Sequence, residues 1–154
     1  MNYKMMAYIL GNIMQAEGLL MSISALLALY KGEINELRAF LITIILLLVI
    51  GTAMKHFAPK NKRIYGREGF VIVALSWIVM SIFGAMPFYL SGAIDGIVNC
   101  LFETVSGFTT TGATVLSEIE GLPMSILFWR SFTHWVGGMG VLVFVMAILP
   151  MSDG

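Results

Sequence analysis

The sequence predicts an all-α integral membrane protein, in which two leading transmembrane helices precede one repeat of helix, re-entrant pore loop and helix. Composition sets the class, because 58% of the 154 residues are hydrophobic and only 12% are charged, whereas about 25% of residues are charged in a typical soluble domain. Several apolar runs are long enough to cross a bilayer core of ~30 Å, which takes about 20 helical residues. A polar segment rich in Thr and Gly separates the last two runs.

The apolar runs cover residues 5–30, 37–54, 69–90 and 124–149. Gln15 and Glu17 interrupt the first run, and no small-residue cleavage site follows it, so we interpret it as a retained helix rather than a signal peptide. One face of this run collects small and polar residues, which is typical of close helix packing in lipid. These residues are Gly11, Gln15, Gly18, Ser22 and Ala25. Glu17 lies beside this face, as an interfacial or paired carboxylate or, alternatively, as a group with a role in transport.

Charge placement predicts the orientation in the membrane. The linker after the second run and its flanks carry basic residues, namely Lys55, Lys60, Lys62, Arg63 and Arg67. By the positive-inside rule this linker is cytoplasmic, and so is the N-terminus. Residues 91–123 contain no Lys or Arg and are expected to face outside. Their acidic residues, which are Asp95, Glu103, Glu118 and Glu120, either attract cations to a pore mouth or simply solvate a loop.

The polar segment 93–114 is predicted to be a pore loop, because non-helical backbone at membrane depth requires surrounding protein or water. Residues 97–107 form a short helix in this prediction, with Gly107 at its end. Its apolar stripe comprises Ile97, Cys100, Leu101, Thr104 and Val105. The chain then turns back through a predicted filter, in which backbone carbonyl oxygens replace the water around a cation. The filter residues are Thr109, Thr110, Thr111 and Gly112, and Gly112 permits positive φ.

Two ionisable side chains, Arg130 and His134, share one face of the last run. An ionisable residue inside a membrane normally has a partner, and we expect Glu103 to be the partner of Arg130. Glu103 and Arg130 then support the filter from behind. The same run contains Gly137, Gly138 and Gly140, which allow either close packing against a neighbour or a hinge.

The motif Leu101-Phe-Glu-Thr-Val-Ser-Gly-Phe-Thr-Thr-Thr-Gly-Ala-Thr114 resembles the first pore loop of the TrkH/TrkG/KtrB potassium transporter family. Two flanking stretches are similar to the helices before and after that loop. They are Arg67-Glu-Gly-Phe through Gly84-Ala-Met-Pro-Phe88, and Phe128-Trp-Arg-Ser-Phe-Thr-His-Trp-Val-Gly-Gly-Met-Gly140. The TrkH branch fits best, because it carries two extra N-terminal helices.

This resemblance implies potassium uptake across a bacterial or archaeal cytoplasmic membrane, through one central pore surrounded by four such repeats of a single polypeptide. Gly112 matches the first filter glycine, which implies potassium binding at Thr110, Thr111 and Gly112. The implied partners are membrane lipid, the remaining repeats, and a second copy of the transporter in a homodimer with a cytosolic nucleotide-binding regulatory subunit. No cofactor is expected beyond the transported potassium ion.

The sequence divides into residues 1–57 with two transmembrane helices, the basic cytoplasmic linker 58–68, the first repeat 69–150 and a truncated end 151–154. We expect the N-terminal piece of a longer transporter; the alternative is a single-repeat subunit that forms tetramers or accompanies another cation channel. We find no Ser/His/Asp set, metal-ligand cluster or phosphate-binding loop that would indicate an enzyme. The net charge of zero indicates no nucleic-acid partner, and the single cysteine, Cys100, is interpreted as structural.

Overall fold

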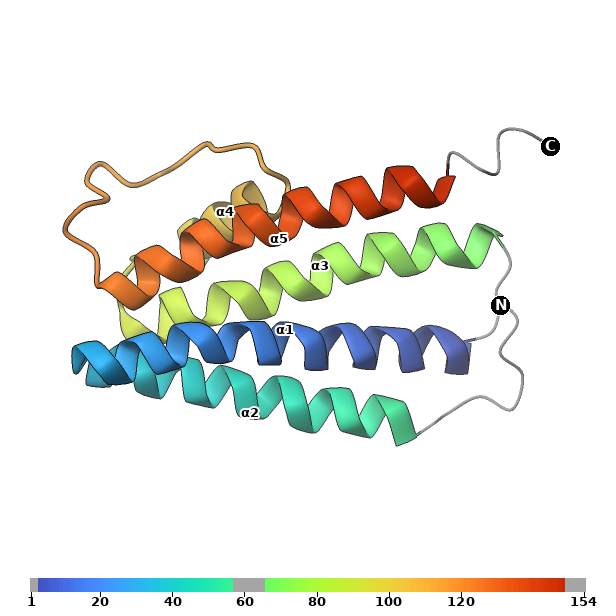
Figure 1. The fold of residues 1–154 in the computed structure, drawn as a ribbon, viewed down its shortest axis with the longest axis horizontal. Coiled ribbons are helices and arrows are strands. Elements are labelled where there is room, and N and C mark those ends of the chain that lie inside the picture. Colours follow the sequence, from blue (N-terminus) through green and yellow to red (C-terminus); the bar gives the residue numbers. More distant parts are fainter. Residues whose placement is uncertain (1–2, 57–65, 149–154) are drawn as a thin grey trace.

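The computed structural model describes residues 3–56 and 66–148, and only the backbone of residues 144–148. Helices are the regular elements of this part of the chain (Figure 1). They are α1 (Tyr3–Lys31), α2 (Ile34–His56), α3 (Gly66–Ser91), α4 (Ile97–Phe108) and α5 (Met124–Ile148). The all-α prediction is confirmed for the described residues, which contain no strand.

The long helices match the predicted apolar runs. α1, α2 and α3 have 29, 23 and 26 residues and are apolar enough to cross a membrane. α5 has 25 residues, about 37 Å at ~1.5 Å per residue, so its length also suffices. α3 begins at Gly66, so Arg67 and Glu68 lie in a helix rather than in the predicted linker. Residues 58–65 of that linker, Leu149 and residues 150–154 lie outside the described residues.

The two leading helices pack closely through glycines, as the small-residue face predicted. A methyl group on Gly11 would lie 2.6 Å from the carbonyl oxygen of Gly51, so a larger residue cannot occupy this position without a backbone shift. Beside this contact, Lys55 donates a hydrogen bond to Gln15 (2.8 Å), and Gln15 donates to Thr52 (2.9 Å). Close backbone approach and interhelical hydrogen bonds are the forces that join helices in lipid.

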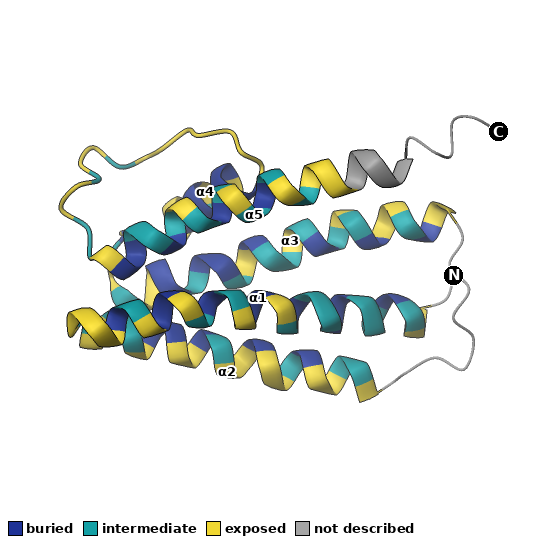
Figure 2. Cartoon of the chain, viewed as in Figure 1, coloured by how far each residue is buried: buried dark blue, intermediate teal, exposed yellow. Residues whose placement is uncertain are grey.

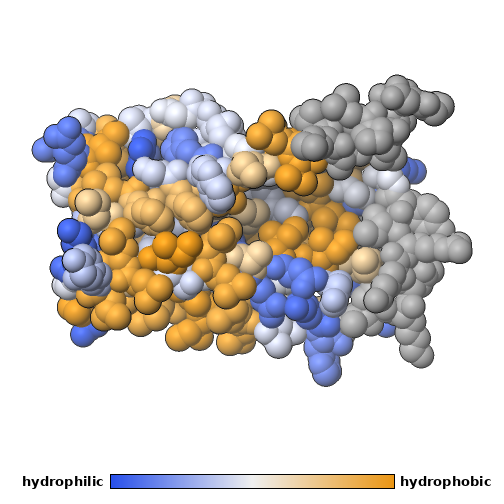
Figure 3. Space-filling model, in the orientation of Figure 1, coloured by the Kyte–Doolittle hydropathy of each residue, from blue (hydrophilic) through white to orange (hydrophobic). Residues whose placement is uncertain are grey.

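Many large apolar residues of the bundle are exposed. Figure 2 marks the exposed positions along the helices, and hydrophobic residues cover much of the face seen in Figure 3. Leu26, Ile45 and Val49 are 65%, 58% and 61% exposed in this chain. In water, so many exposed apolar side chains would form an interaction surface or an aggregation hazard. Lipid hydrocarbon accommodates them, which agrees with the membrane class predicted from composition.

Between α3 and α5 the chain runs partway along the bundle and returns to the end from which it started (Figure 1). Gly92 and Gly96, with φ of 71° and 82°, reverse the chain after α3. α4 then runs inward for 12 residues, about 18 Å at ~1.5 Å per residue, which is too short to span a bilayer. Residues 109–123 return to the start of α5 without regular structure. The order of helix, short helix, loop and helix is that predicted for the repeat.

Candidate functional site

One face of α4 is buried against the bundle and carries polar groups. The buried residues are Cys100, Glu103, Thr104, Ser106, Gly107 and Phe108. The Cys100 thiol donates to the carbonyl of Ile94 (3.4 Å), and the Thr104 hydroxyl donates to the carbonyl of Cys100 (2.8 Å). Within the predicted apolar stripe, Cys100 and Thr104 are buried, whereas Ile97 and Val105 are 59% and 43% exposed in this chain. The helix instead turns inward the face on which Glu103 finds its partners.

The chain leaves α4 through a bend at two residues with positive φ. Thr110 has φ of 55° and Gly112 has φ of 77°. Positive φ is rare for a β-branched residue and persists only where the surroundings hold it. The N–H groups of Thr110 and Thr111 donate to the carbonyls of Gly107 and Ser106, both at 2.9 Å, and so fix the bend. The sequence predicted positive φ at Gly112 but not at Thr110.

The predicted filter residues lie together on the exposed side of this bend. Residues 109–114 are all exposed in this chain. The Thr109 hydroxyl donates to the carbonyl of Val105 (2.7 Å), so Thr111 is the donor in the 2.7 Å contact between the hydroxyls of Thr109 and Thr111. The Ser106 hydroxyl donates to the carbonyl of Ala113 (2.6 Å). Local hydrogen bonds therefore hold the segment in shape while its backbone stays accessible.

The carboxylate of Glu103 ties this segment to α4 and α5. Its side chain is buried, with 1% exposed. Oε1 accepts hydrogen bonds from the hydroxyl of Thr114 (2.5 Å) and the N–H of Val115 (2.7 Å), while Oε2 accepts from Nε of Arg130 (3.0 Å). A buried charge requires such compensation. The ion pair with Arg130 is the contact that the sequence predicted, whereas nothing in the sequence showed where the returning loop would meet Glu103.

Two glycines allow α4 to lie directly on α5. A methyl group on Gly107 would lie 2.1 Å from the hydroxyl oxygen of Thr133, and one on Gly137 would lie 2.0 Å from the carbonyl oxygen of Phe108. The prediction that Gly107 ends the helix is wrong, because α4 continues to Phe108. Gly107 serves close approach instead. For Gly137, the packing interpretation is confirmed.

Side-chain hydrogen bonds to backbone carbonyls surround Arg130 on α5 and join this part of the helix to α3. The Thr133 hydroxyl and Nδ1 of His134 both donate to the carbonyl of Arg130, at 2.6 and 2.9 Å. His134 therefore carries a proton on Nδ1. One turn earlier, Nε1 of the buried Trp129 donates to the carbonyl of Gly84 in α3 (2.9 Å).

A second carboxylate holds the other end of the returning loop. Glu33, in the turn between α1 and α2, accepts hydrogen bonds from the N–H groups of Met124 (2.8 Å) and Ser125 (3.0 Å) and from the Ser125 hydroxyl. It thereby satisfies free N–H groups at the start of α5. Burial raises the pKa of Glu33, but the bonds from Ser125 and Met124 and the charge of Lys31 outweigh it and hold that pKa below its usual value. Sequence analysis missed this contact between distant segments.

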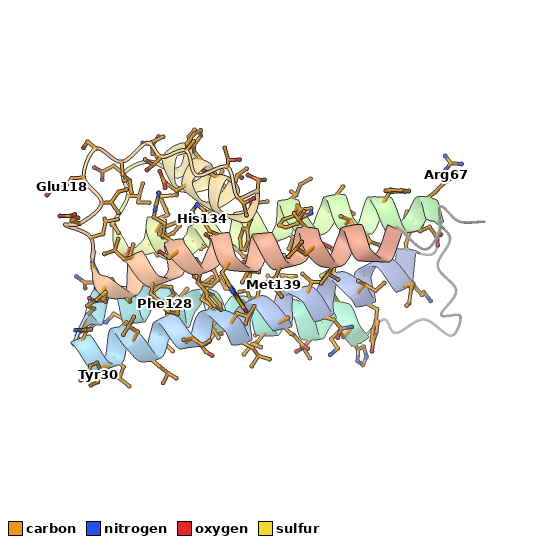
Figure 4. The ribbon with its side chains drawn as sticks, turned by 45° about the horizontal axis from the view of Figure 1, so that its top comes forward. Tyr30, Arg67, Glu118, Phe128, His134 and Met139 are labelled. Carbon is orange, nitrogen blue, oxygen red and sulfur yellow. The ribbon has the colours of Figure 1, made fainter. Side chains whose placement is uncertain are left out.

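Among the other acidic residues of the described chain, Glu17 and Glu68 are buried and Glu36 is half-buried, while the rest are exposed. Glu17 is 2% exposed, and its oxygens have no hydrogen-bond partner in the described part of the chain. The prediction of an interfacial or paired carboxylate is therefore wrong for Glu17. Asp95, Glu118 and Glu120 are exposed, and Glu118 lies at the end of the bundle opposite Arg67 (Figure 4).

Comparison with known proteins identifies the family. The model of a family described as TrkH, cation transport protein, matches residues 36–153. This chain belongs to the TrkH family. The family resemblance expected from the pore-loop motif is confirmed.

Curated relatives and a crystal structure agree with this TrkH assignment. The Trk system potassium uptake protein TrkH of Escherichia coli is 44% identical over 116 residues, which are 74% of this chain and 24% of the relative. An uncharacterized cation transporter of Methanocaldococcus jannaschii is 38% identical over 146 residues, 94% of this chain and 30% of the relative. The crystal structure of the potassium transporter TrkH from Vibrio parahaemolyticus has a TM-score of 0.89 and 34% identity over 97% of this chain and 32% of its own. The chain thus spans less than one third of the length of these relatives.

Proposed function

We propose that this chain forms the N-terminal, first-repeat part of a channel-like transporter that takes up potassium across the cell membrane. The observation that carries the proposal is the exposed bend at Thr110 and Gly112, just beyond which Glu103 binds the returning chain at Thr114 and Val115. The similar TrkH proteins, a potassium uptake protein and a potassium transporter, support the choice of ion.

In this proposal, the carbonyl oxygens of Thr110, Thr111 and Gly112 replace part of the water shell of potassium. α4 ends at the bend, so the partial negative charge of its C-terminal end favours a cation there. The exposed backbone of residues 109–114 would be costly in lipid. The remaining repeats of the full-length protein cover it and supply the other filter strands.

We propose that the N-terminus lies in the cytoplasm and that α4 enters the membrane from outside. The basic Arg67 and the acidic Glu118 at opposite ends of the bundle support this orientation (Figure 4). The exposed Asp95, Glu118 and Glu120 then raise the local concentration of cations at the pore mouth. From the family resemblance, we also propose a homodimer that binds a cytosolic nucleotide-binding regulatory subunit.

Replacement of Gly112 by Ser tests the filter assignment in the full-length protein. A side chain at φ of 77° is strained, and relief of that strain turns the carbonyl of residue 112. We expect the ratio of potassium to sodium uptake to fall, together with potassium-limited growth of an uptake-deficient host.

Gly92→Ser is a matched control for Gly112→Ser. Gly92 has nearly the same φ, 71°, and like Gly112 it has no neighbour within 4 Å of an added Cβ. The two substitutions should therefore cost similar stability, and only Gly112→Ser should change ion preference. An unchanged uptake ratio in well-expressed Gly112→Ser would remove residue 112 from the filter.

Cysteine labelling tests the orientation. In whole cells, a membrane-impermeant thiol reagent should modify Glu118→Cys and should leave Arg67→Cys unmodified until the membrane is permeabilised. Both positions are exposed in this chain, so accessibility in the fold does not bias the comparison. The opposite labelling pattern would invert the proposed orientation.

A further inference from the structure

Glu17 is a buried carboxyl group that the proposed ion pathway does not use. It lies in the middle of α1 and is 2% exposed. Neither of its oxygens has a hydrogen-bond partner within the described residues. Glu103 is equally buried, but its oxygens accept three hydrogen bonds, one of them from Arg130.

The Glu17 carboxyl lies at the junction of α1, α3 and α4. Gly84 of α3 marks this junction. A Cβ atom added to Gly84 would lie 3.3 Å from Oε1 of Glu17 and 2.9 Å from side-chain carbons of both Thr104 and Phe108. Thr104 and Phe108 belong to the buried face of α4. Glu17 is thus wedged behind the short helix whose C-terminal end forms the bend.

The basic groups of the surrounding helices do not neutralise Glu17. On α5, Arg130 donates to Glu103, and His134 donates to its own helix backbone. On α2, Lys55 donates to Gln15. The remaining basic residues of the described chain stand exposed near helix ends, namely Lys4, Lys31, Arg38, His56 and Arg67. The acidic residues of α2, α3 and α4, which are Glu36, Glu68 and Glu103, would only disfavour a second negative charge.

The rest of the full-length protein cannot supply the missing partner without rearranging this bundle. The helices of this chain already bury Glu17 almost completely. Additional repeats can therefore pack only against the outside of these helices. An ionised carboxylate without a partner in such a site is so costly that the group takes up a proton instead.

We propose that Glu17 is a proton-binding site behind the pore helix, where it is held as a neutral carboxylic acid between α1, α3 and α4. This assignment stands on the fold alone and does not depend on which ion the filter selects. Ionisation of Glu17 would place a charge against Thr104 and Phe108, so the neutral form is the one that keeps α4 in its observed place.

Infrared difference spectroscopy of the purified full-length protein in lipid tests this site directly. The spectrum of the wild type minus that of Glu17→Gln at neutral pH should contain the C=O stretching band of a protonated carboxyl group. Glu17→Asp, which keeps an acid at this site, should shift the band rather than remove it. The matched control is Glu103→Gln, whose difference spectrum should contain the bands of an ionised carboxylate.

Expression provides a second measurement that does not require a spectrum. Gln resembles a protonated Glu in shape and has no charge, so Glu17→Gln should accumulate in the membrane at wild-type level, with unchanged thermal stability. If the spectrum of the wild type minus that of Glu17→Gln contains the bands of an ionised carboxylate instead of a protonated carboxyl group, the proposal is overturned. Failure of Glu17→Gln to fold would also overturn it, because the native group would then need its charge.

Discussion

The loop between α4 and α5 is held at both ends by carboxylates, but the two anchors differ in burial and origin. Glu103 binds the inner end, at Thr114 and Val115, and is 1% exposed. Glu33 binds the outer end, at Met124 and Ser125, from a turn at the surface of the bundle. Glu103 belongs to the same helix–loop–helix repeat as the loop, whereas Glu33 comes from the leading hairpin.

Because Glu103 and Glu33 differ in burial and in origin, they have different roles. Water and nearby Lys31 compensate the charge of Glu33 at the surface, so this anchor mainly attaches the leading hairpin to α5. Glu103 is only 1% exposed, and its charge is compensated by Arg130 together with the bonds from Thr114 and Val115. The inner anchor therefore joins the charge balance of the interior to the chain at Thr114 and Val115, just beyond the bend at Thr110 and Gly112.

The largest expected effect is the loss of the inner anchor. Glu103→Gln leaves Arg130 without its counter-charge, and breaking a buried ion pair costs about 3–5 kcal/mol. We expect Glu103→Gln to reduce both the amount of full-length protein in the membrane and its potassium uptake. Quantitative immunoblotting and uptake assays measure the two effects separately.

The double variant Glu103→Gln/Arg130→Gln sharpens this prediction. Removal of both charges eliminates the unpaired cation, so part of the lost expression and uptake should return. If the double variant is no better than the sum of its single variants, Glu103 and Arg130 do not depend on each other.

A smaller effect is expected where α4 rests on α5, next to the inner anchor. Gly137→Ala places a methyl group 2.0 Å from the carbonyl oxygen of Phe108, and overpacking typically costs about 1–3 kcal/mol. We expect a lower unfolding temperature and weaker potassium selectivity, because α4 must shift.

Gly138→Ala is the control for Gly137→Ala, since its methyl group would lie 3.7 Å from a side-chain carbon of Thr110, an ordinary van der Waals distance. Ala also favours helix more than Gly does. Gly138→Ala should therefore fold at least as well as the wild type. Equal destabilisation by the two substitutions would mean that α4 does not rest on Gly137.

The sequence was sufficient to predict the inner ion pair but not the whole anchor. Charged residues within membrane segments need partners, and this rule alone pairs Glu103 with Arg130. The bonds to Thr114 and Val115 depend on the path of an irregular loop, which periodicity does not describe. The contact of Glu33 with the start of α5 was missed for the same reason, since it joins segments that are far apart in the sequence. Glu33 and Met124 are separated by 91 positions.

Helix positions were predictable from apolar runs, whereas the roles of single residues were less so. Gly107 looked like a helix end, but its contact with Thr133 depends on how α4 packs on α5. Thr110 was predicted only as a filter residue, and its positive φ is held by bonds to Ser106 and Gly107 that the sequence does not show. Glu17 looked interfacial because its burial depends on α3 and α4, which the α1 sequence cannot show.

The smallest expected effect concerns the outer anchor and depends on pH. Folding lowers the pKa of Glu33, so ionised Glu33 stabilises the folded protein fully at a pH above its unfolded pKa of about 4.3. This contribution to stability is lost as the pH falls through the lower pKa of the folded state. At neutral pH, Glu33→Gln should lower the unfolding temperature slightly, and this difference from the wild type should shrink in acid.

Thermal unfolding of the full-length wild type and Glu33→Gln, followed from neutral pH into acid, measures this dependence. Glu36→Gln is a suitable control, since Glu36 lies in the first turn of the neighbouring α2. A difference between Glu33→Gln and the wild type that grows in acid would contradict the assigned role of Glu33.

The most direct test of the proposed role of Glu103 is the ratio of potassium to sodium uptake in Glu103→Gln and Glu33→Gln, each normalised to the amount of protein in the membrane. If the inner anchor alone controls the filter, the ratio falls in Glu103→Gln and stays at the wild-type value in Glu33→Gln. An unchanged ratio in Glu103→Gln, or an equal fall in both variants, would contradict the claim that Glu103 holds the filter in shape.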